Sequence, residues 1–268
     1  MVQIEQMKAV ILAGGFGTRI DSEALSKPKP MVEVGGKPIL WHIMKIYSSY
    51  GINDFIICLG YKGNVIRNYF SEYFLNNADV TFSYKDNSMS VHKNDCEPWN
   101  VTLVDTGENV MTGSRIKQIQ KYIDSTFMVT YGDGVSDIDL CELLSFHYQH
   151  RKIATVSSIQ YEEQFGILKL EKNNVVNRFY EKPKSNNWAN MGFYVFEPEI
   201  FDYIEDGLGV SLEKDPMKRL VQNKQLVTYQ HYGFWKCMDT INDRNILEKM
   251  WAADPKWAVW KNERRLSS

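Results

Sequence analysis

The sequence predicts an α/β fold, in which a mostly parallel mixed sheet carries helices on both faces. Short apolar runs such as residues 8–13 and 54–59 end at glycines, as buried parallel strands do. Stretches with apolar residues at helical spacing lie between these runs. Because strand–helix–strand repetition produces parallel sheets with covered faces, we expect a Rossmann-like arrangement.

The first part of the chain contains a regular succession of elements. Pro38 begins a helix, because its fixed φ suits the first helical turn, and Gly51 ends that helix. Each apolar run in this part stops at a glycine or at a polar residue. The expected order is strand 8–13, helix 38–50, strand 54–59, helix 65–74, strand 127–131, helix 140–147 and strand 153–159.

The remaining segments are less regular. Residues 76–112 are polar and mixed, and they are expected to form an excursion with antiparallel strands at 79–84 and 101–105. Further elements are expected at 165–170, 175–180 and 192–196 (strands) and at 242–250 (helix). Because no repeat, low-complexity segment or clear linker is found, the chain is interpreted as one domain over 1–268 with a helical C-terminal region.

The composition narrows the classes of partner. The 268 residues include 31 Lys plus Arg and 33 Asp plus Glu, so the net charge is −2. This balance lacks the basic surplus of a nucleic-acid binder, and no run of about 18 apolar residues predicts a membrane span. The first eight residues show no apolar signal-peptide core. Four scattered cysteines suit reduced thiols, so we expect a cytoplasmic protein with neither nucleic acid nor membrane as partner.

A glycine-rich loop follows the first strand. Leu12-Ala-Gly-Gly-Phe-Gly-Thr-Arg19 lets backbone N–H groups approach an anion closely, and Arg19 adds a guanidinium fork for phosphate oxygens. A tight turn without a ligand explains the glycines equally well. The loop lacks the Lys-Ser/Thr of a Walker A motif, and Ile20 stands in place of the third glycine of the dinucleotide fingerprint.

A second basic motif lies eight residues after Arg19. In Lys27-Pro-Lys-Pro30 the prolines favour extended backbone, so the two lysines are expected to point the same way. Two ammonium groups beside a glycine-rich loop suit a polyphosphate. Taken alone, however, the motif is better explained as a solvated basic turn.

Two aspartates are candidates for binding a divalent cation. Asp133 lies in Gly-Asp-Gly at the end of a strand, and Asp239 follows another expected strand segment. Mg²⁺ prefers one or two carboxylates together with phosphate oxygens and waters. Turn or helix-cap aspartates are the alternative, since Asp239 is also well placed to cap a helix near Asn242. Their separation in the sequence leaves open whether the two carboxylates meet.

Taken together, these motifs resemble those of the sugar-1-phosphate nucleotidyltransferases. The glycine-rich loop and Lys27-Pro-Lys-Pro30 occur in that family's order, followed by Gly36-Lys-Pro-Ile-Leu40, Thr130-Tyr-Gly-Asp-Gly134 and Gly233-Phe-Trp-x-x-Met-Asp-Thr240. The resemblance covers nearly the whole chain and is greatest to the family's cytidylyltransferases. It implies the nucleotidyltransferase fold and transfer of a cytidylyl group from CTP to glucose 1-phosphate, with release of pyrophosphate.

The resemblance also implies roles for individual residues. Arg115 is implied in cytidine recognition and Lys182 in binding the sugar phosphate, although helix capping around 112–115 and a solvated loop lysine explain these segments when they are taken alone. The implied set is Arg19, Lys29 and Asp133 (catalysis), Leu12, Ala13, Gly14, Gly15, Gly17, Thr18, Arg19, Lys29, Thr112, Arg115 and Gly132 (nucleotide), Lys182 and Asn190 (sugar phosphate), and Asp133 and Asp239 (Mg²⁺).

Two positions depart from the family pattern. Met191 replaces a glycine beside Asn190 and is expected to add bulk near the implied sugar pocket, and Gln164 stands where the family commonly has arginine. These departures leave open another phosphorylated acceptor. A second enzyme interpretation keeps the fold but uses another NTP or another acceptor. A nucleotide-binding regulatory subunit without turnover is a further alternative. The resemblance begins at Met7, after residues 1–6, and it implies a homo-oligomer.

Overall fold

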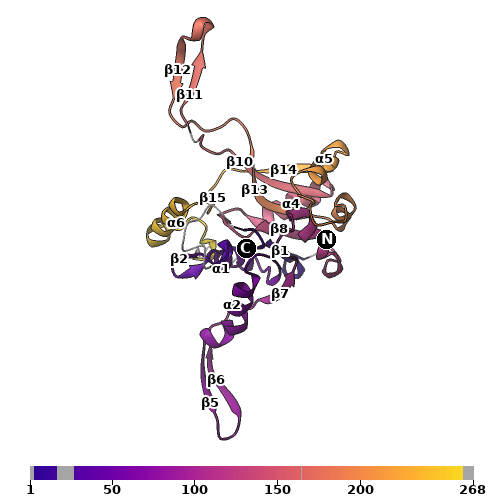
Figure 1. Ribbon diagram of the computed structural model, residues 1–268, viewed down its shortest axis with the longest axis vertical. Coiled ribbons are helices and arrows are strands. Elements are labelled where there is room, and N and C mark those ends of the chain that lie inside the picture. The colour runs from indigo at the N-terminus through magenta and orange to yellow at the C-terminus, as the bar shows by residue number, and fades with distance from the viewer. Residues whose placement is uncertain (1–2, 17–26, 164, 262–268) are drawn as a thin grey trace.

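The computed structural model describes residues 3–16, 27–163 and 165–261, and it contains a central seven-stranded sheet (Figure 1). In spatial order the strands are β14 (Leu226–His231), β10 (Ala154–Ile159), β13 (Ala189–Phe196), β8 (Phe127–Tyr131), β1 (Lys8–Leu12), β4 (Asp54–Leu59) and β7 (Asn100–Asp105). β13 is antiparallel to both of its neighbours, and all other neighbouring pairs in this sheet are parallel. The expected α/β class with a mostly parallel mixed sheet is therefore confirmed.

Helices cover both faces of this sheet. Side chains alternate along β1, so that Ala9 and Ile11 join one buried cluster while Val10 and Leu12 join the other. The first face is covered by α1 (Ile39–Ser48), α2 (Gly63–Asn76), α4 (Leu140–His150) and α6 (Ile241–Ala253), and the second by α3 (Thr112–Gln118), η5 (Pro198–Tyr203) and α5 (Asp215–Gln222). The apolar runs of the sequence thus form a sheet that is buried on both sides.

Two hairpins extend away from the body at opposite ends of its longest axis (Figure 1). One consists of β5 (Ala78–Ser83) and β6 (Ser88–Asn94), and the other of β11 (Ile167–Leu170) and β12 (Val176–Tyr180). The remaining short elements are η1 (Ile4–Gln6), η2 (Lys29–Met31), β2 (Glu33–Val34), β3 (Lys37–Pro38), η3 (Gln120–Tyr122), β9 (Gly134–Ser136), η4 (Lys172–Asn174), β15 (Trp235–Cys237) and η6 (Val259–Lys261). No described helix is long and apolar enough to cross a membrane.

The structure corrects two details of the expected middle region. The antiparallel excursion, expected over 76–112, is confined to the β5–β6 hairpin, because residues 100–105 form β7 and pair in parallel with β4 at the edge of the central sheet. Val101 and Leu103 pack against the core there, which explains why this segment joins the sheet. The helix expected near Ile116 begins four residues earlier, at Thr112.

Candidate active site

A cavity of about 530 Å³ opens where β1 and β8 end. Ligands in open α/β sheets bind outside the carboxyl ends of the strands, so this edge is the expected place for a site. Four segments line the cavity: residues 12–16 of the glycine-rich loop, Lys29 and Pro30, residues 108–112 with Arg115, and residues 131–133. Asp239 completes the lining from the loop before α6.

Lys29 joins the two candidate metal ligands. Its Nζ lies 2.5 Å from Oδ2 of Asp133 and 2.6 Å from Oδ1 of Asp239, so two carboxylates from distant parts of the chain meet around one cation. Burial by itself would lower the pKa of Lys29, but the charge of Asp133 and hydrogen bonds to both carboxylates raise the pKa above its usual value. The ammonium group is therefore firmly protonated, and it occupies the place of a cation between the two acids.

A small antiparallel ribbon brings the two aspartates together. β9 pairs with β15, and Met238 donates its backbone N–H to the carbonyl of Asp133 at 2.9 Å. The alternative role of Asp239 as a helix cap is excluded, because Thr240 is the N-cap of α6 and forms a capping box with Asp243. Asp239 is therefore available to the cavity, where its side chain is 43% exposed.

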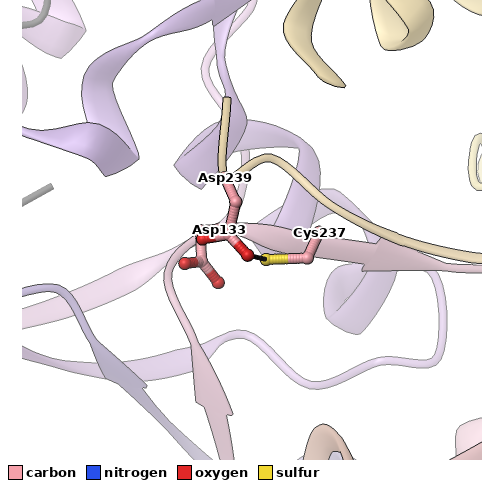
Figure 2. Close-up of side chains that lie close together, drawn as sticks. All are labelled: Asp133, Cys237 and Asp239. Atoms are coloured by element: carbon pink, nitrogen blue, oxygen red, sulfur yellow. Dashed lines mark hydrogen bonds between the residues drawn. The ribbon is translucent and has the colours of Figure 1, made fainter. Parts of the chain in front are cut away.

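Cys237 is a member of this cluster that the sequence analysis did not identify. The potential metal ligands of three residues, Asp133, Cys237 and Asp239, lie within 4.8 Å of one another. The Cys237 thiol donates a hydrogen bond to Oδ2 of Asp239 at 3.4 Å (Figure 2). Burial and the neighbouring carboxylate of Asp133 raise the pKa of this thiol. No local pattern marks this residue, because β15 ends at Cys237 and Asp239 follows in the loop before α6.

The glycine-rich loop lies beside this cluster. Leu12, Ala13, Gly14 and Gly15 line the cavity, whereas Gly17, Thr18 and Arg19 lie outside the described residues. A Cβ atom at Gly14 would come within 2.1 Å of the Arg115 guanidinium, so this position requires glycine. The absence of a side chain at Gly14 therefore leaves room for the Arg115 guanidinium, which donates to the Gly14 carbonyl at 2.9 Å.

Gly132 also allows a close approach of backbone segments. Its N–H donates to the carbonyl of Leu12 at 3.1 Å, and a Cβ atom here would lie 3.1 Å from that same oxygen. Gly132 thus holds the end of β8 against the end of β1, which places Asp133 next to the glycine-rich loop.

The two lysines of the Lys-Pro-Lys-Pro motif do not act together, contrary to the expectation from alternation. Lys29 opens η2 and reaches the aspartates, whereas Lys27 pairs with Glu33 at 2.8 Å and does not line the cavity. The reason is that η2 turns the backbone directly after Pro28, so the extended geometry that would align the two side chains ends there.

Arg115 is buried beneath the cavity, with 3% of its surface exposed. Its guanidinium donates to the carbonyls of Gly14, Leu59, Gly107 and Glu108 and to the hydroxyl of Thr106, at distances from 2.6 to 3.1 Å. Burial lowers the pKa of Arg115 from its usual value. The planar fork thus ties the glycine-rich loop to residues 107–108 on the other side of the cavity.

A chain of hydrogen bonds connects the expected nucleotide residue Thr112 with the expected sugar residue Asn190. Thr112 donates its hydroxyl to Glu213 at 2.7 Å, and Glu213 also accepts from the Tyr131 hydroxyl. Tyr131 and Tyr194 share a hydrogen bond of 2.9 Å, and the amide of Asn190 donates to the Tyr194 hydroxyl at 2.5 Å. Burial alone would raise the pKa of Glu213, but hydrogen bonds from three hydroxyl groups lower it.

The structure corrects the expected consequence of Met191. Its side chain is 2% exposed and packs in the core cluster of the first face, because residues along β13 alternate between the two sides of the sheet. Met191 therefore adds bulk to the core, and it does not line the cavity. Gln164, the other departure, lies outside the described residues.

Lys182 is exposed in the connection between β12 and β13, with a left-handed φ of 41°. Lys182 is not among the described residues that line the cavity. Asn190 is exposed at the start of β13, and its contact with the cavity runs through Tyr194 and Tyr131. The structure thus brings Lys29, Asp133, Asp239 and the loop together, and it leaves the two expected sugar-phosphate residues outside the cavity lining.

A model of the nucleotidyl transferase family matches residues 8–248 of the chain. The chain belongs to the nucleotidyl transferase family. This nucleotidyl transferase is 49% identical over 259 residues to glucose-1-phosphate cytidylyltransferase of Salmonella typhi, a match that covers 95% of this chain and 100% of the relative. It is 41% identical over 256 residues to a probable glucose-1-phosphate cytidylyltransferase of Bacillus subtilis, with the same coverage of 95% and 100%.

Solved structures show the same fold at lower identity. HddC from Yersinia pseudotuberculosis superimposes with a TM-score of 0.65 and 22% identity, covering 92% of this nucleotidyl transferase and 100% of that chain. A UDP-glucose pyrophosphorylase complexed with UDP-glucose superimposes with a TM-score of 0.64 and 17% identity, covering 92% and 98%. At these identities the likeness bears on the fold alone.

Proposed function

We propose that this nucleotidyl transferase transfers the cytidylyl group of CTP to glucose 1-phosphate and forms CDP-glucose and pyrophosphate. The observation that carries the proposal is the pair of carboxylates, Asp133 and Asp239, gathered around Lys29 beside a glycine-rich loop at the edge of the sheet. The choice of CTP and glucose 1-phosphate follows the relative that is 49% identical over 95% of the chain.

The reaction requires positioning and charge neutralisation more than proton transfer. A phosphate oxygen of glucose 1-phosphate bonds to the α-phosphorus of CTP, while the bond from that phosphorus to the bridging oxygen breaks and pyrophosphate leaves. The attacking phosphate is already ionised, so no strong protein base is needed. Lys29 is the described cation best placed to neutralise charge on the triphosphate, with Arg19 as the proposed second cation in the same role.

The carboxylates fit a divalent cation. Asp133 and Asp239 offer two oxygens at one place, and Mg²⁺ typically takes one or two carboxylates and completes its coordination with phosphate oxygens and waters. We therefore propose Mg²⁺ as the cofactor. When bound, it would neutralise charge on the triphosphate and act as a Lewis acid at the phosphoryl oxygens.

The loops around the cavity supply the remaining proposed contacts with the nucleotide. The backbone of residues 12–15 is proposed to bind phosphates, as N–H groups of glycine-rich loops do, together with Gly17 and Thr18. Because the Arg115 guanidinium already bonds to five protein oxygens, we propose that it serves the nucleotide by fixing the two loops that flank the cavity. Thr112 and Gly132 line the same cavity.

The sugar phosphate is proposed to enter from the side of β13. Asn190 is the proposed contact for the sugar, oriented by the Tyr194 hydroxyl at 2.5 Å, and Lys182 is the proposed contact for its phosphate. The Met191 departure no longer favours an alternative acceptor, because the Met191 side chain lies in the core.

Tyr194→Phe is expected to raise the KM for glucose 1-phosphate about five- to tenfold with a smaller change in kcat. The Tyr194 side chain is 1% exposed, and its hydroxyl joins Asn190 to Tyr131. Without this hydroxyl the Asn190 amide loses its acceptor, whereas Tyr131 keeps its hydrogen bond to Glu213. Steady-state kinetics with saturating CTP measure the effect. The matched control is Tyr148→Phe, because the Tyr148 hydroxyl is buried without a hydrogen-bond partner among the described residues. An unchanged KM in Tyr194→Phe would exclude this orienting role.

We further propose that the chain forms a homo-oligomer through its β11–β12 hairpin, with a second copy of the chain as the partner. Apolar side chains are exposed on both faces of this two-stranded ribbon, including Leu168 at 51% and its cross-strand partner Phe179 at 62%. The hairpin extends away from the body, so the other residues that the structure describes leave it uncovered (Figure 1). Such exposed apolar area usually marks an interface.

Phe179→Asp is expected to lower the molar mass measured by light scattering, because it puts a charge into the proposed interface. Ser88→Asp is the matched control, since it adds the same charge to an exposed polar position on β6 of the other hairpin. The proposal predicts a smaller assembly for Phe179→Asp alone. Equal masses for the wild type and both variants would contradict it.

The cysteines support a cytoplasmic location. Cys58, Cys96, Cys141 and Cys237 are all free thiols in the structure, and free thiols are stable in a reducing compartment. We therefore propose that the protein acts in the cytoplasm.

The function is tested by measuring pyrophosphate release with each of the four NTPs and with several phosphorylated sugars. The proposal predicts the highest kcat/KM for CTP with glucose 1-phosphate. Faster release with UTP or GTP would replace the base assignment, and binding of CTP without any release would favour a regulatory subunit.

A further inference from the structure

The centre formed by Asp133 and Asp239 contains a sulfur atom in addition to its oxygens. Cys237 Sγ lies 3.4 Å from Oδ2 of Asp239, and the ligand atoms of all three residues lie within 4.8 Å of one another. In Figure 2 the three side chains converge on one place from two strand ends. None of the three is fully buried, and Asp133 and Asp239 line the cavity, so a cation can approach the group from that side.

This donor set differs from the one that Mg²⁺ prefers. Mg²⁺ is a hard cation that binds oxygen, whereas thiolate sulfur favours softer cations such as Zn²⁺, Co²⁺ and Cd²⁺. With Zn–S of about 2.3 Å and Zn–O of about 2.1 Å, neighbouring sulfur and oxygen ligands of a tetrahedral site lie about 3.6 Å apart. The observed 3.4 Å between Sγ and Oδ2 is close to that ligand edge.

We propose that Asp133, Asp239 and Cys237 bind a thiophilic divalent cation of the Zn²⁺, Co²⁺ or Cd²⁺ class more tightly than they bind Mg²⁺, with Cys237 as the third protein ligand. This inference depends on the proposed function in one respect: it takes the two aspartates as the place where the reaction's cation binds. The thiol proton passes to solvent when the metal–sulfur bond forms. Three protein ligands leave a position open for water or a phosphate oxygen, as in zinc sites with an exchangeable ligand.

Lys29 shows that this place attracts positive charge. Its ammonium lies 2.5 and 2.6 Å from the two carboxylates, which would otherwise repel each other. A divalent cation carries twice that charge and gains the sulfur as a further donor, so it is expected to displace the ammonium group. The released Lys29 would then be free to contact an anionic ligand in the same cavity.

The test is a titration of the full-length protein with Co²⁺ alone, without nucleotide or sugar. Cobalt–thiolate bonds absorb strongly in the near ultraviolet, so the absorbance reports the sulfur directly. The wild type is expected to show this band, and Cys237→Ser and Cys237→Ala are expected to lose it. The matched control is Cys141→Ser, because Cys141 is an exposed cysteine on α4. By calorimetry, Cd²⁺ affinity is expected to fall at least tenfold in Cys237→Ser, while Mg²⁺ affinity changes less than about twofold.

The outcomes separate this inference from the proposed function. A wild type that binds Co²⁺ without the band, or a Cys237→Ser variant that keeps it, would overturn the inference. Normal pyrophosphate release from CTP in the same preparation would then leave the function intact. Conversely, a Cys237-dependent band in a protein that releases no pyrophosphate with Mg²⁺ would support the metal site and contradict the function.

Discussion

Asp133→Asn is expected to lower kcat for cytidylyl transfer about 1000-fold. The change keeps the size of the side chain but removes a negative charge from the pair that surrounds Lys29, and it removes a proposed Mg²⁺ ligand. The fold is expected to persist, since the Asp133 side chain is 25% exposed and its backbone carbonyl still accepts from Met238. Pyrophosphate release at saturating CTP and Mg²⁺ measures the effect.

The control for this variant is Asp124→Asn, which removes a carboxylate that is 80% exposed outside the cavity. Its rate should equal that of the wild type. If Asp133→Asn retained more than about a tenth of the wild-type rate, the carboxylate pair would not be the centre of the reaction.

Lys29→Met is expected to lower kcat/KM for CTP about 100- to 1000-fold. Methionine resembles the aliphatic part of lysine but has no ammonium group, so the variant leaves two neighbouring carboxylates unneutralised and removes the described cation closest to the proposed triphosphate. Steady-state kinetics across CTP concentrations measure the loss.

Lys27→Met provides the matched control from the same Lys-Pro-Lys-Pro motif. Lys27 is half-exposed and pairs with Glu33 away from the cavity, so its loss should change kcat/KM less than about twofold, as expected for a surface ion pair. Equal losses in the two variants would mean that the motif acts through its net charge rather than through the position of Lys29.

The strands of this fold could be predicted from the sequence because they are buried on both faces. Residues 54–59 and 127–131 are mostly apolar runs that are each followed by a glycine, and they coincide with β4 and β8. β6 was missed because Ser88–Asn94 is exposed along its whole length, so no burial pattern marks it. β7 was wrongly expected in the antiparallel excursion. Its partner β4 lies about 45 residues earlier in the chain, and parallel pairing across that distance leaves no local signal in the sequence.

The site was predictable in its residue types but not in its contacts. Asp133 and Asp239 were expected to bind a metal from resemblance, yet their meeting depends on the β9–β15 ribbon, which involves only three residues of each strand. The burial of Arg115 among five acceptors depends on loops that converge only in the folded chain. Cys237 has no motif of its own, and it becomes visible only beside the two carboxylates.

The fate of the α-phosphate of CTP is the most direct test of cytidylyl transfer at Asp133 and Asp239. CTP labelled at the α-phosphate is incubated with the protein, Mg²⁺ and glucose 1-phosphate, and the products are separated. We expect the label to appear in CDP-glucose together with an equal amount of pyrophosphate, and we expect Asp133→Asn to form both about 1000-fold more slowly. Label that stays in CTP, or that appears in CMP or CDP without a sugar nucleotide, would contradict cytidylyl transfer at this centre.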